Sequence, residues 1–314
     1  MRKIAITTST FAEFDPAPLK MLQEAATEVV LNPYGRALTE SEAREILDGC
    51  VGVLAGTEPL GKGVLPFLPE LKVISRCGVG LDSIDLPLAA QLGIKIYSTP
   101  DAPVPAVAEL TLALALDVAR RISNHDRTVR AGTWKKKLGR LLAGQKVGVV
   151  GYGRIGRRVA SLFQAVGCEV AVCDPALALM MPGQETSTGI PAPLNLTLPE
   201  LLTWCDGLTL HCPSQPDGPL LGRAELALLQ QGAWIINAAR GGLIDEDALA
   251  VALAEGRLSG AALDVFSHEP YRGPLTGLDN IILTPHIGSY ARETRAEMEH
   301  EAALNLLQGL QMLE

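Results

Sequence analysis

The sequence predicts an α/β protein with two domains, each a parallel sheet covered by helices on both faces. The chain has 314 residues, whereas a typical domain has about 100–150. Short apolar runs rich in β-branched residues alternate with amphipathic segments, which is the pattern of parallel sheets. Aromatic residues make up only 4 % of the chain, as in a globular protein with many short connections.

The first domain is expected to contain five strands with helices between them. Apolar periodicity predicts amphipathic helices over 18–27, 40–49 and 86–92. The segment Pro103–Pro105 is a helix-start signal, so we end this domain at residue 101. The predicted strands are Lys3–Thr7, Glu28–Asn32, Val51–Gly56, Lys72–Ser75 and Ile94–Tyr97.

The second domain is expected to open with one long helix over 106–131, followed by a six-stranded sheet. A final helix over 291–310, with Ser289 as its N-cap, cannot form a domain alone and should pack on the first domain. The domains are therefore 1–101 with 290–314, and 102–289. The six predicted strands are Lys146–Val150, Glu169–Cys173, Gly207–His211, Ala233–Ala238, Gly260–Val265 and Ile281–Leu283.

Charge and cysteine usage exclude several classes of protein. The net charge of −8 argues against a nucleic-acid partner, which needs a basic face. No apolar stretch is long enough for a signal peptide or a membrane span. The six cysteines are widely spread and form no C-x-x-C pair, so we expect reduced thiols, no metal site and a cytoplasmic location.

The sharpest local motif is G-x-G-x-x-G, formed by Gly151, Gly153 and Gly156. It directly follows the predicted strand 146–150 and opens a helix. In that context the glycines permit a tight turn and let a pyrophosphate approach the amides at the helix N-terminus. The motif predicts a dinucleotide site.

Asp174 ends the next predicted strand, at the separation of about 20 residues expected for a ribose-binding acid. A carboxylate there would accept hydrogen bonds from the ribose and repel a 2′-phosphate. No Arg or Lys occurs between Pro175 and Gly222. The sequence therefore predicts NAD in preference to NADP.

Three ionisable residues follow the last three predicted strands. Ligands of open parallel sheets bind beyond the carboxyl ends of the strands, where Arg240, Glu269 and His286 are expected. His286 can donate or accept a proton near neutral pH. Glu269 can orient its ring, and Arg240 can hold a carboxylate and polarise a carbonyl group. Together they suit hydride transfer to a 2-oxo acid.

At these residues the chain resembles the D-isomer-specific 2-hydroxyacid dehydrogenases, in the branch that includes D-3-phosphoglycerate dehydrogenase and the glyoxylate/hydroxypyruvate reductases. The segments that carry the resemblance are Arg76–Asp82, Val107–Glu109, the glycine motif with Asp174, Asn237–Gly242, Asp264–Pro270 and Pro285–Ser289.

The resemblance implies two Rossmann-like domains, a flavodoxin-like substrate domain and an NAD-binding domain, in a homodimer formed largely through the latter. It implies that Arg240, Glu269 and His286 are catalytic and that Asp264 meets the nicotinamide amide. The implied cofactor-binding residues are Gly151, Gly153, Arg154, Ile155, Gly156, Asp174, Ala238, Ala239, Arg240, Asp264, His286 and Gly288. The implied substrate-binding residues are Arg76, Val79, Gly80, Arg240 and His286, with the carboxylate on the backbone of Val79 and Gly80.

Several alternatives remain open at this point. Arg36 and Arg76 could bind a substrate phosphate or could be surface charges. Pro103 stands near the place where relatives often carry Asn, which puts that substrate contact in doubt. An NAD-sensing corepressor-like protein, or a formate- or phosphite-type dehydrogenase, would have a similar fold.

Overall fold

A computed structural model of the chain describes residues 3–177 and 193–313, and it confirms the predicted fold class. The chain divides into two compact units. Unit 1 is Met1–Pro103 with Tyr290–Glu314, and unit 2 is Val104–Ser289. The chain first passes from unit 1 to unit 2 after Pro103 and not after residue 101, because helix α4 begins at Val104.

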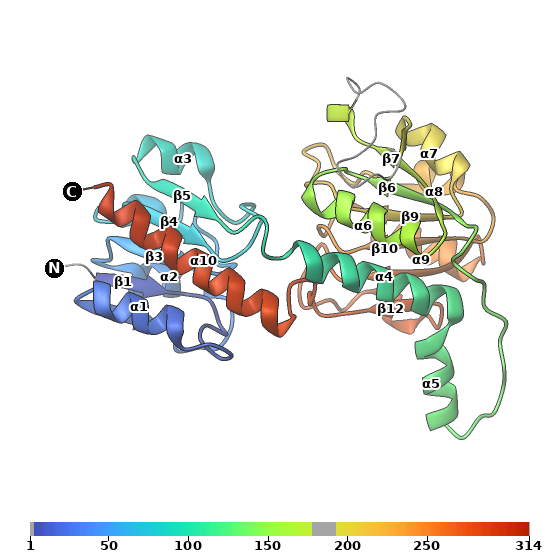
Figure 1. Cartoon of the computed structure of the whole chain (residues 1–314), viewed down its shortest axis with the longest axis horizontal. Helices are drawn as coiled ribbons and strands as arrows, with labels where there is room; N and C mark the ends of the chain where they lie inside the picture. The colour runs from blue at the N-terminus through green and yellow to red at the C-terminus, as the bar shows by residue number, and fades with distance from the viewer. Residues whose placement is uncertain (1–2, 178–192, 314) are drawn as a thin grey trace. The chain divides into compact units, whose positions relative to one another are not determined.

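Unit 1 contains a five-stranded parallel sheet in the order β2-β1-β3-β4-β5 (Figure 1). This is the flavodoxin-like order, whose switch point lies between β1 and β3. The strands are β1 Lys3–Ile6, β2 Glu28–Leu31, β3 Gly52–Ala55, β4 Val73–Arg76 and β5 Lys95–Ser98. The helices are α1 Ala17–Ala25, α2 Glu40–Leu47, the 3₁₀ turn η1 Leu65–Phe67, α3 Leu86–Gln91 and α10 Arg292–Gln311.

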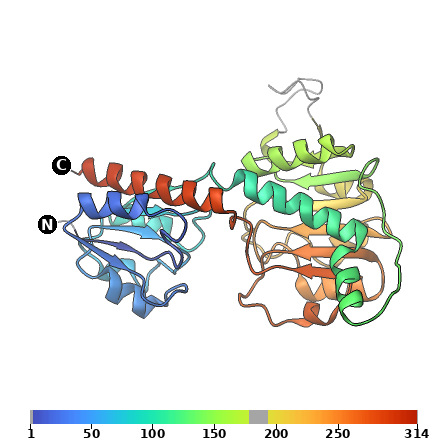
Figure 2. The ribbon, with the colours of Figure 1, turned by 60° about the horizontal axis from the view of Figure 1, so that its bottom comes forward.

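The final helix α10 packs on the sheet of unit 1, as predicted. It lies beside α1 on one face of that sheet, while α2 and α3 cover the other (Figures 1 and 2). The hydroxyl of Ser75 donates to the carbonyl of Ala302 at 2.7 Å. The predicted N-cap was wrong: Ala291 occupies the cap position with no side-chain bond, and Ser289 lies outside the helix.

Unit 2 contains a seven-stranded parallel sheet in the order β12-β11-β10-β9-β6-β7-β8. The additional strand β8 has only two exposed residues, too few to show alternation in the sequence. It pairs with β7 and holds Asp174 through the side chain of Asn195. The strands are β6 Lys146–Val150, β7 Glu169–Cys173, β8 Leu194–Asn195, β9 Gly207–Leu210, β10 Ala233–Asn237, β11 Leu258–Leu263 and β12 Ile281–Leu283.

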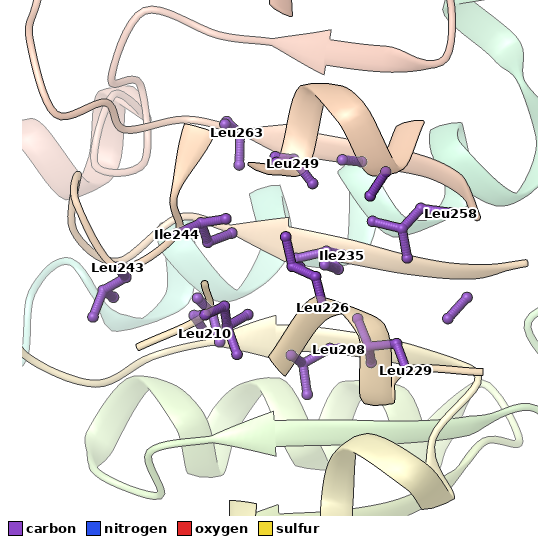
Figure 3. Packing of buried hydrophobic residues seen from close by; sticks show 14 of the residues in the cluster. Leu208, Leu210, Leu226, Leu229, Ile235, Leu243, Ile244, Leu249, Leu258 and Leu263 are labelled. Carbon is purple, nitrogen blue, oxygen red and sulfur yellow. The ribbon is translucent and has the colours of Figure 1, made fainter. Parts of the chain in front are cut away.

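Helices cover both faces of the unit 2 sheet and bury its apolar strands. On one face α4 and α6 pack around Phe163 and Trp234. On the other face, leucine and isoleucine side chains from β9, β10 and β11 interdigitate with α8 and α9 (Figure 3). The helices are α4 Val104–Arg120, α5 Ile122–Arg130, α6 Arg154–Ala165, α7 Leu198–Trp204, α8 Arg223–Leu228 and α9 Glu246–Ala254, with 3₁₀ turns η2 Pro175–Leu177 and η3 Pro274–Gly277.

The long helix predicted over 106–131 is two helices. The chain breaks at Arg121, which adopts a left-handed conformation with φ of 56°. Asp117 explains the break locally, because its carboxylate accepts bonds from both the amide and the hydroxyl of Ser123 and so competes with the helical ladder. Apolar periodicity continues through this point, so it did not predict the break.

Candidate active site

The glycine-rich turn joins β6 to α6 and has the stereochemistry that a dinucleotide requires. Gly151 has φ of 90°, and a Cβ there would lie 2.5 Å from the carbonyl oxygen of His211. A Cβ on Gly156 would overlap the carbonyl of Gly151, so only glycine lets α6 approach the turn. A Cβ on Gly153 would meet nothing within 4 Å. The space beside Gly153 is therefore where a pyrophosphate can approach the backbone.

The N-terminus of α6 lies at the glycine turn. Gly153 is the N-cap residue and supplies no side-chain bond, while Arg154 and Ile155 occupy the first helical positions. The positive end of the helix dipole favours phosphate oxygens there. These residues fit the pyrophosphate of a dinucleotide.

Asp174 lies directly after β7 and is tied to the same turn. One carboxylate oxygen accepts the amide of Tyr152 at 2.6 Å, and the other accepts the amide of Ala176 at 2.8 Å. The backbone amide of Asp174 also donates to Asn195 at 3.1 Å. The carboxylate is thus held beside the glycine turn, where ribose hydroxyls can reach its remaining lone pairs.

Arg240 lies on a short loop after β10 that is shaped by the buried side chain of Asn237. Asn237 accepts the amide of Ala239 at 3.1 Å and donates to the carbonyl of Arg240 at 2.8 Å. A Cβ on the next residue, Gly241, would overlap the carbonyl of Phe266. Glycine therefore brings the arginine-bearing loop into direct contact with the loop that carries Glu269.

Glu269 and His286 form a contacting pair at the carboxyl edge of the unit 2 sheet. His286 Nδ1 lies 3.0 Å from Glu269 Oε2, and both side chains are about half exposed. The other oxygen of Glu269 accepts the amide of Phe266 at 3.1 Å. This arrangement orients the imidazole and leaves its Nε2 outside the pair.

The contact changes the pKa of both groups. The hydrogen bond that His286 donates to Glu269 raises the pKa of His286 against the opposing effect of desolvation, and the charges of Asp264 and Arg240 act on it as well. Desolvation favours the neutral form of Glu269, but the bond and charge of His286 outweigh it and lower the pKa of that carboxyl. An imidazolium that persists to higher pH is suited to donating a proton.

His286 stands in a loop organised by Asp264. His286 has φ of 56°, a left-handed conformation that costs a non-glycine residue about 1–3 kcal/mol. Asp264 is fully buried at the end of β11, and its two oxygens accept the amides of Ile287 and Gly288 and the hydroxyl of Thr284. Thr284 was not singled out from the sequence; its position at a strand end two residues before His286 was the available signal.

The predicted substrate residues of unit 1 lie after β4. Val79 is exposed and Gly80 half-buried, and neither belongs to a strand or helix, so no ladder uses their amides. Arg76 Nη1 donates to the carbonyl of Cys77 within this turn. Arg36 makes a two-pronged ion pair with Glu42, with N–O distances of 2.9 and 2.7 Å.

Residues 3–177 and 193–313 contain no group of three or more His, Cys, Asp or Glu side chains that could hold a metal ion. No helix among them combines the length and apolar character that a bilayer crossing requires.

Comparisons with known proteins agree with this geometry. The family model of the D-isomer specific 2-hydroxyacid dehydrogenase, NAD binding domain, matches residues 112–288, more than half of the chain. D-3-phosphoglycerate dehydrogenase of Methanocaldococcus jannaschii is 38 % identical over 282 residues, which are 88 % of this chain and 52 % of that protein. The chain spans about half the length of the curated relatives it matches.

Solved structures match over nearly their whole length. The TT0316 protein of Thermus thermophilus is 36 % identical, with a TM-score of 0.87 over 99 % of this chain and 97 % of that one. D-lactate dehydrogenase of Aquifex aeolicus, solved with NAD and lactic acid, is 26 % identical, with a TM-score of 0.81 over 96 % of this chain and 93 % of that one.

The matched model covers the glycine turn, Asp174, Arg240, Glu269 and His286. It is the model of an NAD-binding domain, and the open space at Gly153 and the uncapped N-terminus of α6 fit such a cofactor. NAD is therefore the cofactor of unit 2. The chain belongs to the D-isomer-specific 2-hydroxyacid dehydrogenase family.

Proposed function

We propose that this chain is an NAD-dependent oxidoreductase that interconverts small D-2-hydroxy acids and 2-oxo acids. The observation that carries the proposal is the 3.0 Å contact between His286 and Glu269. It lies at the carboxyl edge of the same sheet that holds the glycine turn and the Arg240 loop. An oriented acid–base group, a carboxylate-binding arginine and a nicotinamide site are what this chemistry needs.

Each residue has a defined task in the proposed reaction. The bound nicotinamide supplies or accepts the hydride. His286 donates a proton from Nε2 to the carbonyl oxygen during reduction and takes it back during oxidation. Glu269 fixes the ring through Nδ1, while Arg240 grips the substrate carboxylate and polarises the carbonyl. In unit 1 we assign an anion-binding role to the amides of Val79 and Gly80, because successive amides in a turn can bind a substrate carboxylate.

We further propose that the substrate carries no phosphate, in the manner of glyoxylate or hydroxypyruvate. The curated relatives named D-3-phosphoglycerate dehydrogenase favour the phosphorylated type. Against this, the two arginines weighed as phosphate anchors have other partners: Arg36 is paired with Glu42, and Arg76 donates within its own turn. A phosphate dianion needs charge-assisted donors, which these contacts would have to release.

The test offers NADH with glyoxylate, hydroxypyruvate and 3-phosphohydroxypyruvate to wild-type protein and to His286→Gln. We expect His286→Gln to lose about 10²–10⁴-fold in kcat, the usual contribution of a general acid, while NADH binding persists. His300→Gln, on an exposed position of α10, is the control and should keep wild-type kcat. Near wild-type turnover in His286→Gln would reject the assigned acid.

The same experiment separates the alternatives. A higher kcat/KM with the phosphorylated substrate would reject the substrate proposal and leave the reaction class standing. Tight NADH binding without turnover of any 2-oxo acid would favour an NAD-sensing protein. NADPH used more efficiently than NADH would reject the preference for NAD that we base on Asp174.

We also propose that two copies of this chain associate through α5 and the segment 131–141. This part of unit 2 exposes large apolar side chains, including Trp134 at 83 % and Leu138 at 96 % of their maximal area, and it extends from the body of unit 2 (Figures 1 and 2). Exposed apolar clusters usually mark contact surfaces. A sedimentation experiment should give a dimer for the wild-type chain, and a monomer for the double variant Trp134→Ser with Leu138→Ser.

We also propose a cytoplasmic location for this chain. The six cysteines are free thiols, which suits a reducing compartment.

A further inference from the structure

A buried or half-buried polar residue ends each of the three strands that lead to the catalytic loops. Asn237 ends β10 and shapes the loop that carries Arg240. Asp264 follows β11, and Thr284 follows β12. Backbone bonds continue the ladder through these positions: Asp264 donates to Asn237 at 2.9 Å, and Thr284 donates to Leu263 at 3.0 Å. The sheet therefore fixes the backbone positions of these three residues.

The carboxylate of Asp264 joins three donors from the loop 284–288. Oδ1 accepts the hydroxyl of Thr284 at 2.6 Å and the amide of Ile287 at 2.8 Å, while Oδ2 accepts the amide of Gly288 at 2.7 Å. A Cβ on Gly288 would approach Oδ2 to 3.2 Å, so glycine allows this close contact. The loop is anchored on both sides of His286.

His286 lies at the centre of this loop in a conformation that it would not adopt without support. Its φ is 56°, and its amide donates to the carbonyl of Thr284 at 3.0 Å. Backbone strain of this kind persists only where neighbouring contacts determine it. Because Thr284 and Asp264 supply those contacts, the direction of the His286 ring depends on them.

Resting on the proposed function, we infer that Thr284 and Asp264 are positioning residues for His286. The Thr284 hydroxyl orients the Asp264 carboxylate so that it binds the amides of Ile287 and Gly288, and this keeps the imidazole within reach of Glu269. A carboxylate has about four acceptor positions, and three of those of the fully buried Asp264 bind the loop. Thr284 carries only the positioning task.

The test compares Thr284→Val, which keeps the shape but removes the hydroxyl, with Thr284→Ser, which restores it. Displacing a catalytic group by about 1 Å can lower the rate by about a hundredfold, so we expect Thr284→Val to lose about ten- to a hundredfold in kcat. KM and the Kd for NADH should stay within about twofold of wild type. Thr284→Ser should recover most of kcat.

A matched control removes a hydroxyl elsewhere in unit 2. Thr276 donates to the carbonyl of Gly273 at 2.9 Å on an exposed turn, and Thr276→Val should keep wild-type kcat. Wild-type kcat in Thr284→Val would overturn the proposal. So would an equal loss in Thr284→Ser, or a loss of NADH affinity in step with kcat, which would place the hydroxyl at the cofactor.

A second readout does not depend on turnover. The ring-proton NMR signal of His286, assigned by its absence in His286→Gln, reports its titration. Glu269 and Asp264 face this ring and raise its pKa, and Arg240 lowers it. In Thr284→Val the ring leaves Glu269, so its pKa should fall toward the ordinary value. An unchanged titration would contradict the positioning role, even if wild-type protein reduced no 2-oxo acid and the proposed function failed.

Discussion

The carboxyl edges of the two sheets are built from similar folds but present opposite kinds of chemistry. In unit 1 one ionisable group is hidden: Glu58 is fully buried, and Thr7 donates to it. The turn of Val79 and Gly80 lies at the same edge, and Asp82 and Asp101 nearby are exposed. In unit 2 the arrangement is reversed, because His286 and Glu269 are half exposed and the side chains that hold their loops are buried.

This difference separates two ways of making a site. An edge that offers backbone amides can bind an anion, but a buried ionisable group such as Glu58 is closed to proton exchange with a ligand. An edge with exposed, paired ionisable groups can exchange protons, provided that buried residues fix their positions. The parallel sheet supplies the same frame to both, so the side chains at the strand ends decide the task.

The largest expected effect breaks the cofactor function of unit 2 without breaking its fold. Gly153→Val places a side chain in open space next to α6, so it should weaken NADH binding by at least about tenfold, while Tm falls by no more than about 2–4 °C because Val is a poorer N-cap than Gly. Gly156→Ala should lower Tm, because its Cβ overlaps the Gly151 carbonyl.

The control for that comparison is Gly61→Val, since a Cβ on Gly61 in unit 1 also meets nothing within 4 Å. It should leave both NADH affinity and Tm unchanged. Fluorescence titration and thermal melting check all three variants. Wild-type affinity in Gly153→Val would mean that the pyrophosphate does not use this turn.

The next largest effect concerns the pair of His286 and Glu269. Reduction requires protonated His286, so kcat should fall as pH rises through its raised pKa. Glu269 raises that pKa, and therefore Glu269→Gln should move the falling limb of the pH–kcat profile to lower pH, besides reducing the maximum about tenfold or more. A limb that stays in place would show that the titrating group is not His286.

A smaller effect tests the buried acid of unit 1. Burial raises the pKa of Glu58, so the folded state retains a proton that the unfolded state loses above about pH 4.5, and stability falls as pH rises toward the folded pKa. Glu58→Gln should raise Tm by about 2–4 °C at pH 8 and lose this advantage near pH 4. An equal gain at both pH values would contradict the buried acid as its source.

The opposite sign is expected for Glu42, a half-buried acid of the same unit. The ion pair with Arg36 and the bond from Thr39 lower the pKa of Glu42 to about 2. Its contribution to stability should be present above about pH 4.5 and fade as pH falls toward 2. Glu42→Gln therefore serves as the control for Glu58→Gln.

The smallest effect concerns the turn after β4. If the substrate carboxylate binds the backbone there, the side chain of Val79 contributes little, and Val79→Ala should change KM less than about threefold. A much larger increase in KM would mean that the side chain itself contacts the substrate.

Local signals in the sequence predicted most of the fold and the candidate site. Every expected strand has a counterpart in the sheets, because buried parallel strands read as continuous apolar runs. The glycine turn, Asp174, Arg240, Glu269 and His286 were each found from their place at a strand end. The contact between His286 and Glu269 followed from the rule that carboxyl ends of parallel strands share one edge.

The rest depended on contacts that the sequence does not display. The break at Arg121 requires the carboxylate of Asp117 to capture Ser123, and this competes with an otherwise continuous helical pattern. Strand β8 exists only by pairing with β7. The burial of Glu58 was equally invisible, since its side chain is polar and its neighbours give no periodicity.

The contact at Gly241 has a consequence for redesign. Since the arginine loop touches the glutamate loop backbone to backbone, the Cα positions of Arg240 and Glu269 are fixed relative to one another. The distance between these two backbone positions should suit the part that all the proposed substrates share, which is the carboxylate and its neighbouring carbonyl. Selection for bulkier substrates should therefore yield few changes at residues 240–242.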